Sequence, residues 1–110
     1  MPVPAYPRRG EVYLARVDKV RPVIVLSVDE LNKFAFDVCV VPITTKEHTK
    51  FSMRVPLGRR DGGLDYDCWA KCDQVTTLEK DLLKYPALGI LPSEKFNRIE
   101  EQVKLCLGLI

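Results

Sequence analysis

The chain has 110 residues, which is enough for one hydrophobic core and too few for two. We therefore expect a single domain over residues 1–110. Hydrophobic residues make up 46% of the sequence and charged residues 29%, a composition far from that of disordered chains. The 17 Lys and Arg residues exceed the 15 Asp and Glu residues by only two. This balance does not by itself indicate a nucleic-acid partner, so a basic binding surface would have to be local.

The sequence shows neither a membrane segment nor a secretion signal. The longest apolar runs, residues 23–26 and 38–43, are far shorter than the roughly 20 residues of a spanning helix. Residues 1–10 contain three prolines and two arginines but no apolar stretch of the signal-peptide kind. We therefore expect a cytoplasmic protein without a membrane partner.

The four cysteines lie among apolar residues and are too few for a disulfide scaffold, so we expect reduced core cysteines. The alternative is a metal site through Cys68 and Cys72. Their C-x3-C spacing is wider than that of the common zinc knuckle, no matching second pair follows, and His48 is the single histidine. Glycine-rich nucleotide motifs and the HExxH zinc motif are also missing from the sequence. We therefore expect no metal and no cofactor.

Short apolar stretches predict three strands in the first 43 residues. Residues 11–17 alternate between two faces, and residues 22–28 are almost continuously apolar, as in a central strand buried on both faces. Residues 29–32 predict a turn or a helical crossover. The third strand covers residues 36–43, and Pro42 is expected to end its regular pairing.

The next segments predict further short strands. A fourth strand covers residues 51–57 and a fifth covers residues 68–75, with a turn-rich stretch at residues 58–67 between them. Residues 78–83 predict one helical turn, and residues 88–91 predict a short strand before a proline.

A helix closes the chain. Ser93 is expected to cap its N-terminus, Glu94 favours the positive end of the helix, and one apolar stripe recurs at helical spacing. Several strands covered by one amphipathic helix predict a mainly β fold, a small bent β-barrel with short helices and a C-terminal α-helix. The apolar stripe consists of Phe96, Ile99, Val103 and Cys106.

Polar residues at the ends of the apolar strands are the main candidates for a site. Arg21 precedes Pro22, which restricts the arginine backbone to extended geometry, and Thr44 and Thr45 follow the strand of residues 36–43. The segment around His48 is polar and predicts a loop, where a single histidine is more often solvated than catalytic.

The fifth predicted strand carries a second set of candidates. The period of two places Trp69, Lys71 and Asp73 on one face, opposite the small apolar residues. From these residues alone, an ordinary solvated ion pair between Lys71 and Asp73 is the favoured interpretation.

Six short motifs follow one another along the chain. They are Arg9-Gly10-Glu11-Val12, Arg21-Pro22-Val23-Ile24-Val25-Leu26-Ser27 with Asp29-Glu30-Leu31-Asn32, Val41-Pro42-Ile43-Thr44-Thr45, Val55-Pro56-Leu57, Cys72-Asp73-Gln74-Val75-Thr76-Thr77, and residues 105–109. Each motif alone is weak, but in this order and spacing, from about residue 9 to the C-terminus, the chain resembles the MazF/PemK family of toxin endoribonucleases.

The resemblance implies an SH3-like, CcdB-like barrel, a homodimer, and metal-independent, sequence-specific cleavage of single-stranded RNA. It also implies a cognate antitoxin protein as a partner, with growth inhibition through mRNA cleavage. The resemblance implies that Arg21 and Thr44 are the catalytic pair that most members of the family share. It also implies that Asp73 and Lys71 take part in catalysis, as in the PemK-like branch.

The residue types suit the chemistry that the resemblance implies. Asp73 can act as the base toward a 2′-hydroxyl and Lys71 as the acid toward the leaving 5′-oxygen, while Arg21 and Thr44 donate hydrogen bonds to the phosphate. Some schemes of the family give the base and acid roles to the arginine instead; we favour Arg21 as an electrostatic stabiliser. The products implied are a 2′,3′-cyclic phosphate and a 5′-hydroxyl. DNA lacks the 2′-hydroxyl, so we expect it not to be cut.

Other basic and polar residues are expected to bind RNA. The loop between the first two strands, residues 18–20, is shorter than in many relatives, and Lys71 replaces the arginine of the PemK-like branch. Trp69 has two interpretations, base stacking or an apolar contact. The expected RNA-binding residues are Lys19, Thr45, Arg54, Gln74 and His48, and the local basic patch can also draw on Lys46, Lys50, Arg59 and Arg60.

Two other functions compete with the ribonuclease interpretation. One is a non-catalytic β-barrel that binds nucleic acid, and the other is a gyrase poison of the CcdB type. The gyrase interpretation ranks low, because it depends on a C-terminal Trp-Gly-Ile, whereas this chain ends Gly108-Leu109-Ile110.

Overall fold

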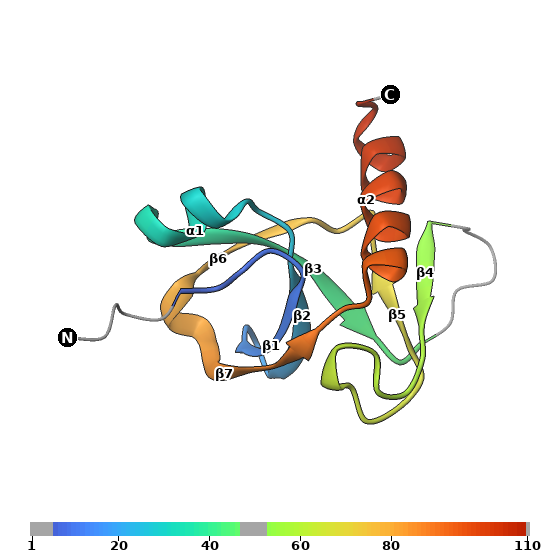
Figure 1. Cartoon of the computed structure of the whole chain (residues 1–110), viewed down its shortest axis with the longest axis horizontal. Coiled ribbons are helices and arrows are strands. Elements are labelled where there is room, and N and C mark those ends of the chain that lie inside the picture. The colour runs from blue at the N-terminus through green and yellow to red at the C-terminus, as the bar shows by residue number, and fades with distance from the viewer. Residues whose placement is uncertain (1–5, 47–52, 110) are drawn as a thin grey trace.

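The computed structural model describes residues 6–46 and 53–109 and has a mainly β fold (Figure 1), as the sequence predicts. The strands form an antiparallel sheet in the order β4-β5-β3-β2-β1-β7, and β6 also pairs with β3. The strands are β1 (Glu11–Arg16), β2 (Val20–Val25), β3 (Asp37–Thr44), β4 (Arg54–Leu57), β5 (Cys68–Lys71), β6 (Thr76–Glu79) and β7 (Leu83–Ile90). The α-helices are α1 (Asp29–Phe34) and α2 (Ser93–Leu107), and two 3₁₀ turns are η1 (Asp61–Gly63) and η2 (Lys80–Leu82).

Strand β3 connects the two parts of the sheet. Residues 37–40 pair with β6, whereas Ile43 and Thr44 pair with β5. On its other edge, β3 pairs with β2 through residues 40–42. The expectation that Pro42 ends the regular pairing holds for β2, whose ladder with β3 ends at Pro42, whereas β3 itself continues to Thr44 and pairs there with β5. On the edge of β3 that pairs with β6 and β5, Pro42 lies between the two ladders. Its missing N–H therefore removes no hydrogen bond to either strand.

Strand β2 is buried on both faces, as its continuous apolar sequence predicts. Ile24 packs in a core cluster with residues of α2, whereas Val23 and Val25 pack in a second cluster with residues of β3 and β6. Truncating a fully buried side chain such as Ile24 to alanine costs about 2–5 kcal/mol. The strand begins at Val20, two residues earlier than expected, so Arg21 lies inside a rigid strand.

A network of hydrogen bonds joins the segment after β2 to α1. Asn32 is fully buried; its Nδ2 donates to the Ser27 carbonyl at 2.8 Å, and its side-chain oxygen accepts from the Ser27 hydroxyl. Lys80 donates to the Asn32 carbonyl at 2.8 Å. The short segment after β2 is therefore a helix with a structural role, since an unsatisfied buried amide would be costly.

Helix α2 packs its predicted stripe on the sheet. Ile99 and Val103 are buried in the first core cluster, and Gly108 ends the helix at φ +69°. The prediction that Ser93 caps this helix is wrong. The cap is Pro92, whose carbonyl accepts the Phe96 N–H at 3.0 Å, and Ser93 is already the first helical residue. In Figure 1, α2 stands against the part of the sheet that contains β4 and β5.

The segment after β4 departs most from the predicted elements. Strand β5 ends at Lys71 instead of continuing to residue 75, because the chain turns and then forms β6. The helical turn expected at residues 78–83 is divided between β6, η2 and the start of β7. Strand β7 is longer than the stretch of residues 88–91 that the sequence predicts, and residues 51–52 of the expected fourth strand lie outside the described residues.

The expectation of reduced core cysteines holds in part, because Cys39 and Cys106 are only half-buried. All four cysteines are free, and Cys68 and Cys72 are buried. Within residues 6–46 and 53–109, no helix has both the length and the apolar sequence that crossing a membrane requires.

Candidate active site

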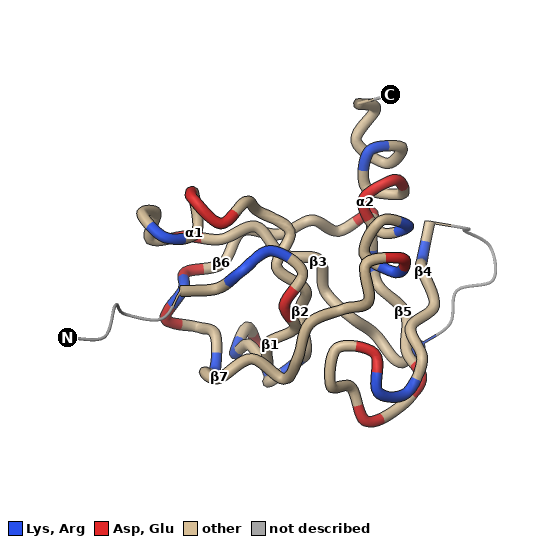
Figure 2. The backbone as a smooth tube through the Cα atoms, in the orientation of Figure 1, with Lys and Arg blue, Asp and Glu red and all other residues tan. Residues whose placement is uncertain are grey.

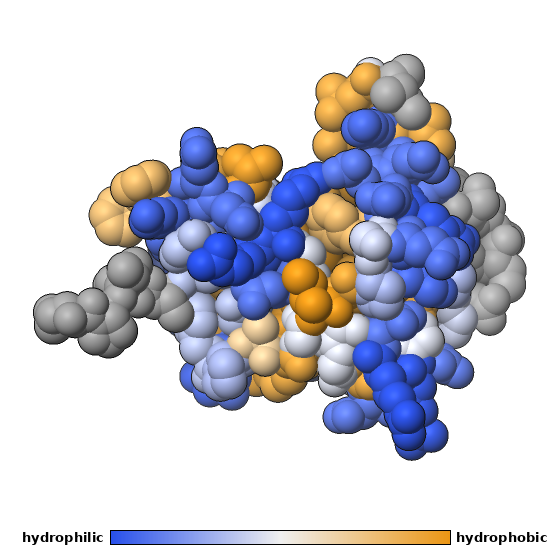
Figure 3. All heavy atoms as spheres, in the orientation of Figure 1, coloured by the Kyte–Doolittle hydropathy of each residue, from blue (hydrophilic) through white to orange (hydrophobic). Residues whose placement is uncertain are grey.

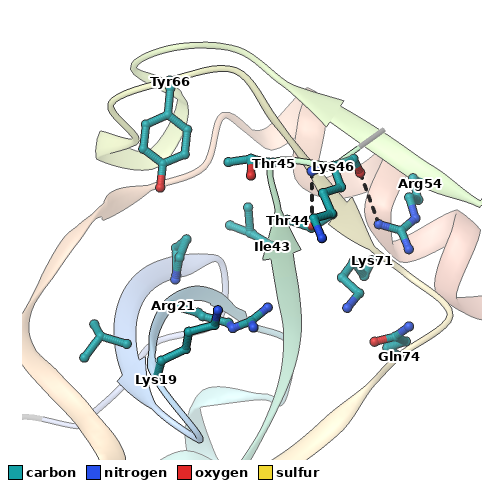
Figure 4. Close-up of a pocket in the computed structure, with 12 residues that line it drawn as sticks. Lys19, Arg21, Ile43, Thr44, Thr45, Lys46, Arg54, Tyr66, Lys71 and Gln74 are labelled. Carbon is teal, nitrogen blue, oxygen red and sulfur yellow. Dashed lines mark hydrogen bonds between the residues drawn. The ribbon is translucent and has the colours of Figure 1, made fainter. Parts of the chain in front are cut away.

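A pocket of about 540 Å³ opens where the β1–β2 hairpin, the end of β3 and the β4–β5 hairpin meet. Figure 4 shows Lys19 and Arg21 on one side of β3, with Arg54, Lys71 and Gln74 on the other. We call this the basic pocket. It is lined by Lys19, Val20, Arg21, Pro22, Ile43, Thr44, Thr45, Lys46, Arg54, Tyr66, Lys71 and Gln74.

Positive charge is concentrated in the basic pocket. Five of its twelve lining residues are Lys or Arg, and none of the twelve is Asp or Glu. Elsewhere along the chain, basic and acidic residues are interspersed (Figure 2). The net charge of +2 therefore hides a local site that favours an anionic ligand.

The pairing of β2 with β3 brings Arg21 and Thr44 to one pocket. Val23 lies opposite Pro42 in the β2–β3 pairing. The ladder ends at this pair, and beyond it Arg21 of β2 and Thr44 of β3 both line the basic pocket. Two residues 23 positions apart in sequence therefore form one wall of the basic pocket.

A pair of like charges forms the opposite wall. Arg54 of β4 lies directly opposite Lys71 of β5 in the ladder. Like charges at such positions destabilise a sheet, so this pair favours a bound anion. Burial lowers the pKa of Lys71 from its ordinary value, and the nearby guanidinium groups of Arg54 and Arg21 lower it further. The Lys71 ammonium group is therefore a better proton donor than a solvated lysine.

Thr44 and Arg21 offer donors to a ligand. The Thr44 hydroxyl oxygen accepts the Lys46 N–H at 3.1 Å, which leaves its hydrogen free to donate. The Arg21 Nε is buried and has no hydrogen-bond partner among the described residues. The Asp18 Oδ1 lies 3.8 Å from this Nε, within ion-pair range but too far for a hydrogen bond. The Arg21 side chain as a whole is 40% exposed, so the exposed part of its guanidinium group is suited to bind an anion that enters from solvent.

The structure places most of the sequence-predicted site residues in this pocket. Arg21, Thr44 and Lys71 line it, and so do four of the five expected RNA-binding residues. His48 and Lys50 lie outside the described residues. The four lining residues are Lys19, Thr45, Arg54 and Gln74, and Lys46 of the expected basic patch lines the pocket as well.

Other predicted residues lie elsewhere. The prediction that Asp73 shares a strand face with Trp69 and Lys71 is wrong, because β5 ends at Lys71 and Asp73 lies exposed in the following turn. Neither Asp73 nor Trp69 is among the pocket-lining residues, and Trp69 lies half-buried opposite Thr44 in the β3–β5 ladder. The Arg59 side chain is bound instead to its own loop, where its Nε donates to the Asp65 carbonyl at 3.1 Å.

Sequence reasoning missed Tyr66 as a pocket residue. Its half-exposed ring comes from the loop between η1 and β5 and points toward Thr45 and the pocket in Figure 4. The one available sign was an aromatic residue in a loop otherwise rich in Gly and Asp. An exposed aromatic ring at the rim of a cationic pocket can stack on a base.

The cysteine pair weighed as a metal site does not suit that role. No group of three or more His, Cys, Asp or Glu side chains comes together within the part of the chain that the structure describes. Burial raises the pKa of Cys68 to about 11 and that of Cys72 to about 12. Burial thus disfavours the thiolate form, which is the form that ligates a metal.

Two comparisons of the sequence with known proteins, one with family models and one with single proteins, indicate the same family. Residues 8–107 match the family model described as PemK-like, MazF-like toxin of type II toxin-antitoxin system. The chain is 32% identical to Endoribonuclease MazF of Staphylococcus saprophyticus, over 93% of this chain and 92% of that protein.

Solved structures with the same fold agree with the sequence matches. A mycobacterial endoribonuclease in complex with its cognate antitoxin is 30% identical, with a TM-score of 0.83 over 94% of this chain and 97% of that one. A second mycobacterial endoribonuclease is 29% identical, with a TM-score of 0.79 over 98% of this chain and 94% of that one.

Proposed function

Because this chain belongs to the PemK-like, MazF-like toxins of type II toxin-antitoxin systems, we propose that it cleaves single-stranded RNA in the basic pocket. The observation that carries this proposal is the convergence of five Lys and Arg side chains with the free Thr44 hydroxyl on one cavity. This arrangement suits a phosphodiester, whose charge grows during cleavage.

We assign the binding of the scissile phosphate to Arg21 and Thr44. The Arg21 side chain lines the basic pocket and is 40% exposed, so its guanidinium group can donate to a phosphate oxygen. The Thr44 hydroxyl donates a further hydrogen bond from the facing strand. Hydrogen bonds fixed in place before the reaction stabilise the phosphorane-like transition state without reorganisation.

Lys71 is the general acid in this mechanism. The 2′-oxygen attacks phosphorus, the bond from phosphorus to the 5′-oxygen breaks, and Lys71 gives its proton to that leaving oxygen. The lowered pKa of Lys71 favours this transfer. The products are a 2′,3′-cyclic phosphate and a 5′-hydroxyl.

We assign the general base to Asp73. It lies in the turn that also carries the pocket residue Gln74, and among the described residues it is the carboxylate that acts on the pKa of Lys71. Because Asp73 is exposed beside the pocket instead of lining it, its role depends on RNA reaching over the rim.

The proposal includes two protein partners and a place of action. Large apolar side chains are exposed over α1 and the end of α2 (Figure 3), among them Leu105, Leu107 and Leu109. We assign such surface to a homodimer and to an antitoxin whose acidic segment would cover the basic pocket. The reduced cysteines and the RNA substrate favour the cytoplasm.

Cleavage of mixed-sequence RNA in the presence of EDTA tests this function. We expect discrete cuts, mapped by primer extension, whose fragments carry cyclic phosphate and 5′-hydroxyl ends. Arg21→Ala and Thr44→Ala should abolish these cuts while circular dichroism and thermal unfolding stay close to wild type. Cuts that persist equally in both variants, or a wild-type protein that makes none, would contradict the proposal.

A further inference from the structure

A second cleft opens beside the basic pocket and shares two of its walls. It measures about 260 Å³, and Arg21 and Lys71 line both cavities. We call it the Asp18 cleft. Its other lining residues are Val17, Asp18, Val23, Val40, Pro42, Thr76 and Leu78.

The floor of the Asp18 cleft is aliphatic and rigid. Val23, Val40 and Leu78 are at most 6% exposed and belong to the second core cluster. Such a floor suits the face of a flat ring, because the ring loses its contact with water without displacing a polar group. The cleft is smaller than the cavities of roughly 300–1,000 Å³ that hold drug-sized ligands.

The polar groups added by the Asp18 cleft are hydrogen-bond acceptors. The Thr76 hydroxyl donates its hydrogen to the Gln74 carbonyl at 2.9 Å, so its oxygen is left to accept. Asp18 Oδ1 accepts the Lys19 N–H at 2.9 Å, which holds the pKa of this carboxyl below its usual range. Asp18 is therefore ionised at neutral pH and presents a charged acceptor.

We propose that the Asp18 cleft binds one base next to the scissile phosphate and selects bases that offer N–H donors, guanine first. The inference rests on the proposed function, because the phosphate held by Arg21 has a nucleotide on each side. One of these nucleotides lies over the basic pocket and its neighbour reaches the cleft that shares Arg21 and Lys71.

The ranking of the bases follows from their edges. Guanine presents two adjacent donors, N1–H and the N2 amino group, to the Asp18 carboxylate, and its O6 and N7 face the cations. Cytosine and adenine each present one amino group. Uracil presents a single N–H between two carbonyl oxygens, which a carboxylate repels. Uridine is therefore the least favoured nucleotide at this position.

Cleavage of matched RNA oligonucleotides tests the assignment. After the cut site is mapped, the nucleotides on each side of the cut bond are varied in turn through all four bases. We expect wild type to cut the best substrate about tenfold faster with guanine than with uracil at one of these positions. Asp18→Asn should reduce this ratio to about twofold, since the amide both donates and accepts, and Thr76→Val should reduce it by a smaller factor.

Two matched variants control for changes in charge and shape. Asp37→Asn removes a carboxylate from an exposed residue of β3, and Thr77→Val changes the exposed neighbour of Thr76; neither residue lines a cavity described above. Both should keep the wild-type ratio. Because Asp18 also lies near Arg21, a loss of rate common to all four bases counts as a positioning effect and contradicts base selection.

The outcomes separate the two proposals. RNA cut equally well with guanine and uracil at both positions, or an Asp18→Asn ratio equal to wild type, overturns the base assignment while leaving the ribonuclease function standing. Such a result would mean that the cleft binds something other than a base, such as a second copy of the chain. A wild-type protein that cuts no RNA overturns both.

Discussion

The basic pocket and the Asp18 cleft share Arg21 and Lys71 but differ in everything around them. Five cations and no carboxylate line the basic pocket, whereas the Asp18 cleft has an aliphatic floor, one carboxylate and one hydroxyl. The first environment is suited to a phosphate and the second to a base. If both proposals hold, the two shared cations Arg21 and Lys71 connect the reaction centre to the site that selects a base.

Substitution of Arg21, which lines both cavities, is expected to have the largest effect on cleavage. Arg21→Lys keeps the charge but loses the planar fork of donors, so cleavage of every RNA should fall by about 10²–10³-fold. Single-turnover rates measure this loss. Arg16→Lys, at the exposed end of β1, makes the same exchange outside both cavities and should keep the wild-type rate. Equal rates for Arg21→Lys and wild type would show that the Arg21 guanidinium does not act on the scissile phosphate.

The second shared residue is expected to control the alkaline side of the pH profile. A general acid is active only while protonated, so cleavage should fall as pH rises through the lowered pKa of Lys71, earlier than for a solvated lysine. Lys71→Arg should remove this fall, because arginine stays protonated, and should lower the neutral rate by about 10²-fold.

Arg54→Ala supplies the matched test of that pH profile. It removes a positive neighbour that lowers the pKa of Lys71, so the alkaline fall should move to higher pH. An alkaline fall that stays at the same pH in both Lys71→Arg and Arg54→Ala would show that another group is the acid.

A smaller effect should separate the two cavities. Arg54 lines the basic pocket but not the Asp18 cleft. Arg54→Ala should therefore weaken RNA binding several-fold, and by the same factor for all sequences. It should also reduce the slope of log affinity against log salt by about 0.7. Titrations at several salt concentrations measure this slope. Arg98→Ala, on the exposed side of α2, is the control for the lost charge. A change in base preference with Arg54→Ala would mean that the cavities do not act separately.

The sequence was sufficient to predict much of the fold and part of the site. Continuous apolar residues predicted the central strand β2, and the spacing of Ile99 and Val103 predicted the buried face of α2. Arg21 and Thr44 could be named because they stand at the ends of apolar strands, and in the structure both line the basic pocket.

The remaining features depend on where strands stop and how loops return. Nothing local separates the end of β5 at Lys71 from a strand that continues to residue 75, since the burial of Cys72 fits either interpretation. That difference moves Asp73 away from the face of Lys71. Tyr66 and the Asp18 cleft were missed because their residues come from loops and strands whose meeting is decided by tertiary packing.

In the proposed mechanism, the basic pocket cleaves RNA through the 2′-hydroxyl next to the phosphate that Arg21 binds. The most direct measurement uses the mapped RNA substrate with a single 2′-deoxy nucleotide on the 5′ side of the cut bond. We predict unchanged binding in a fluorescence titration and complete loss of cleavage at that bond, with no effect of EDTA on the unmodified RNA. Cleavage of the 2′-deoxy substrate at the wild-type rate would contradict the account.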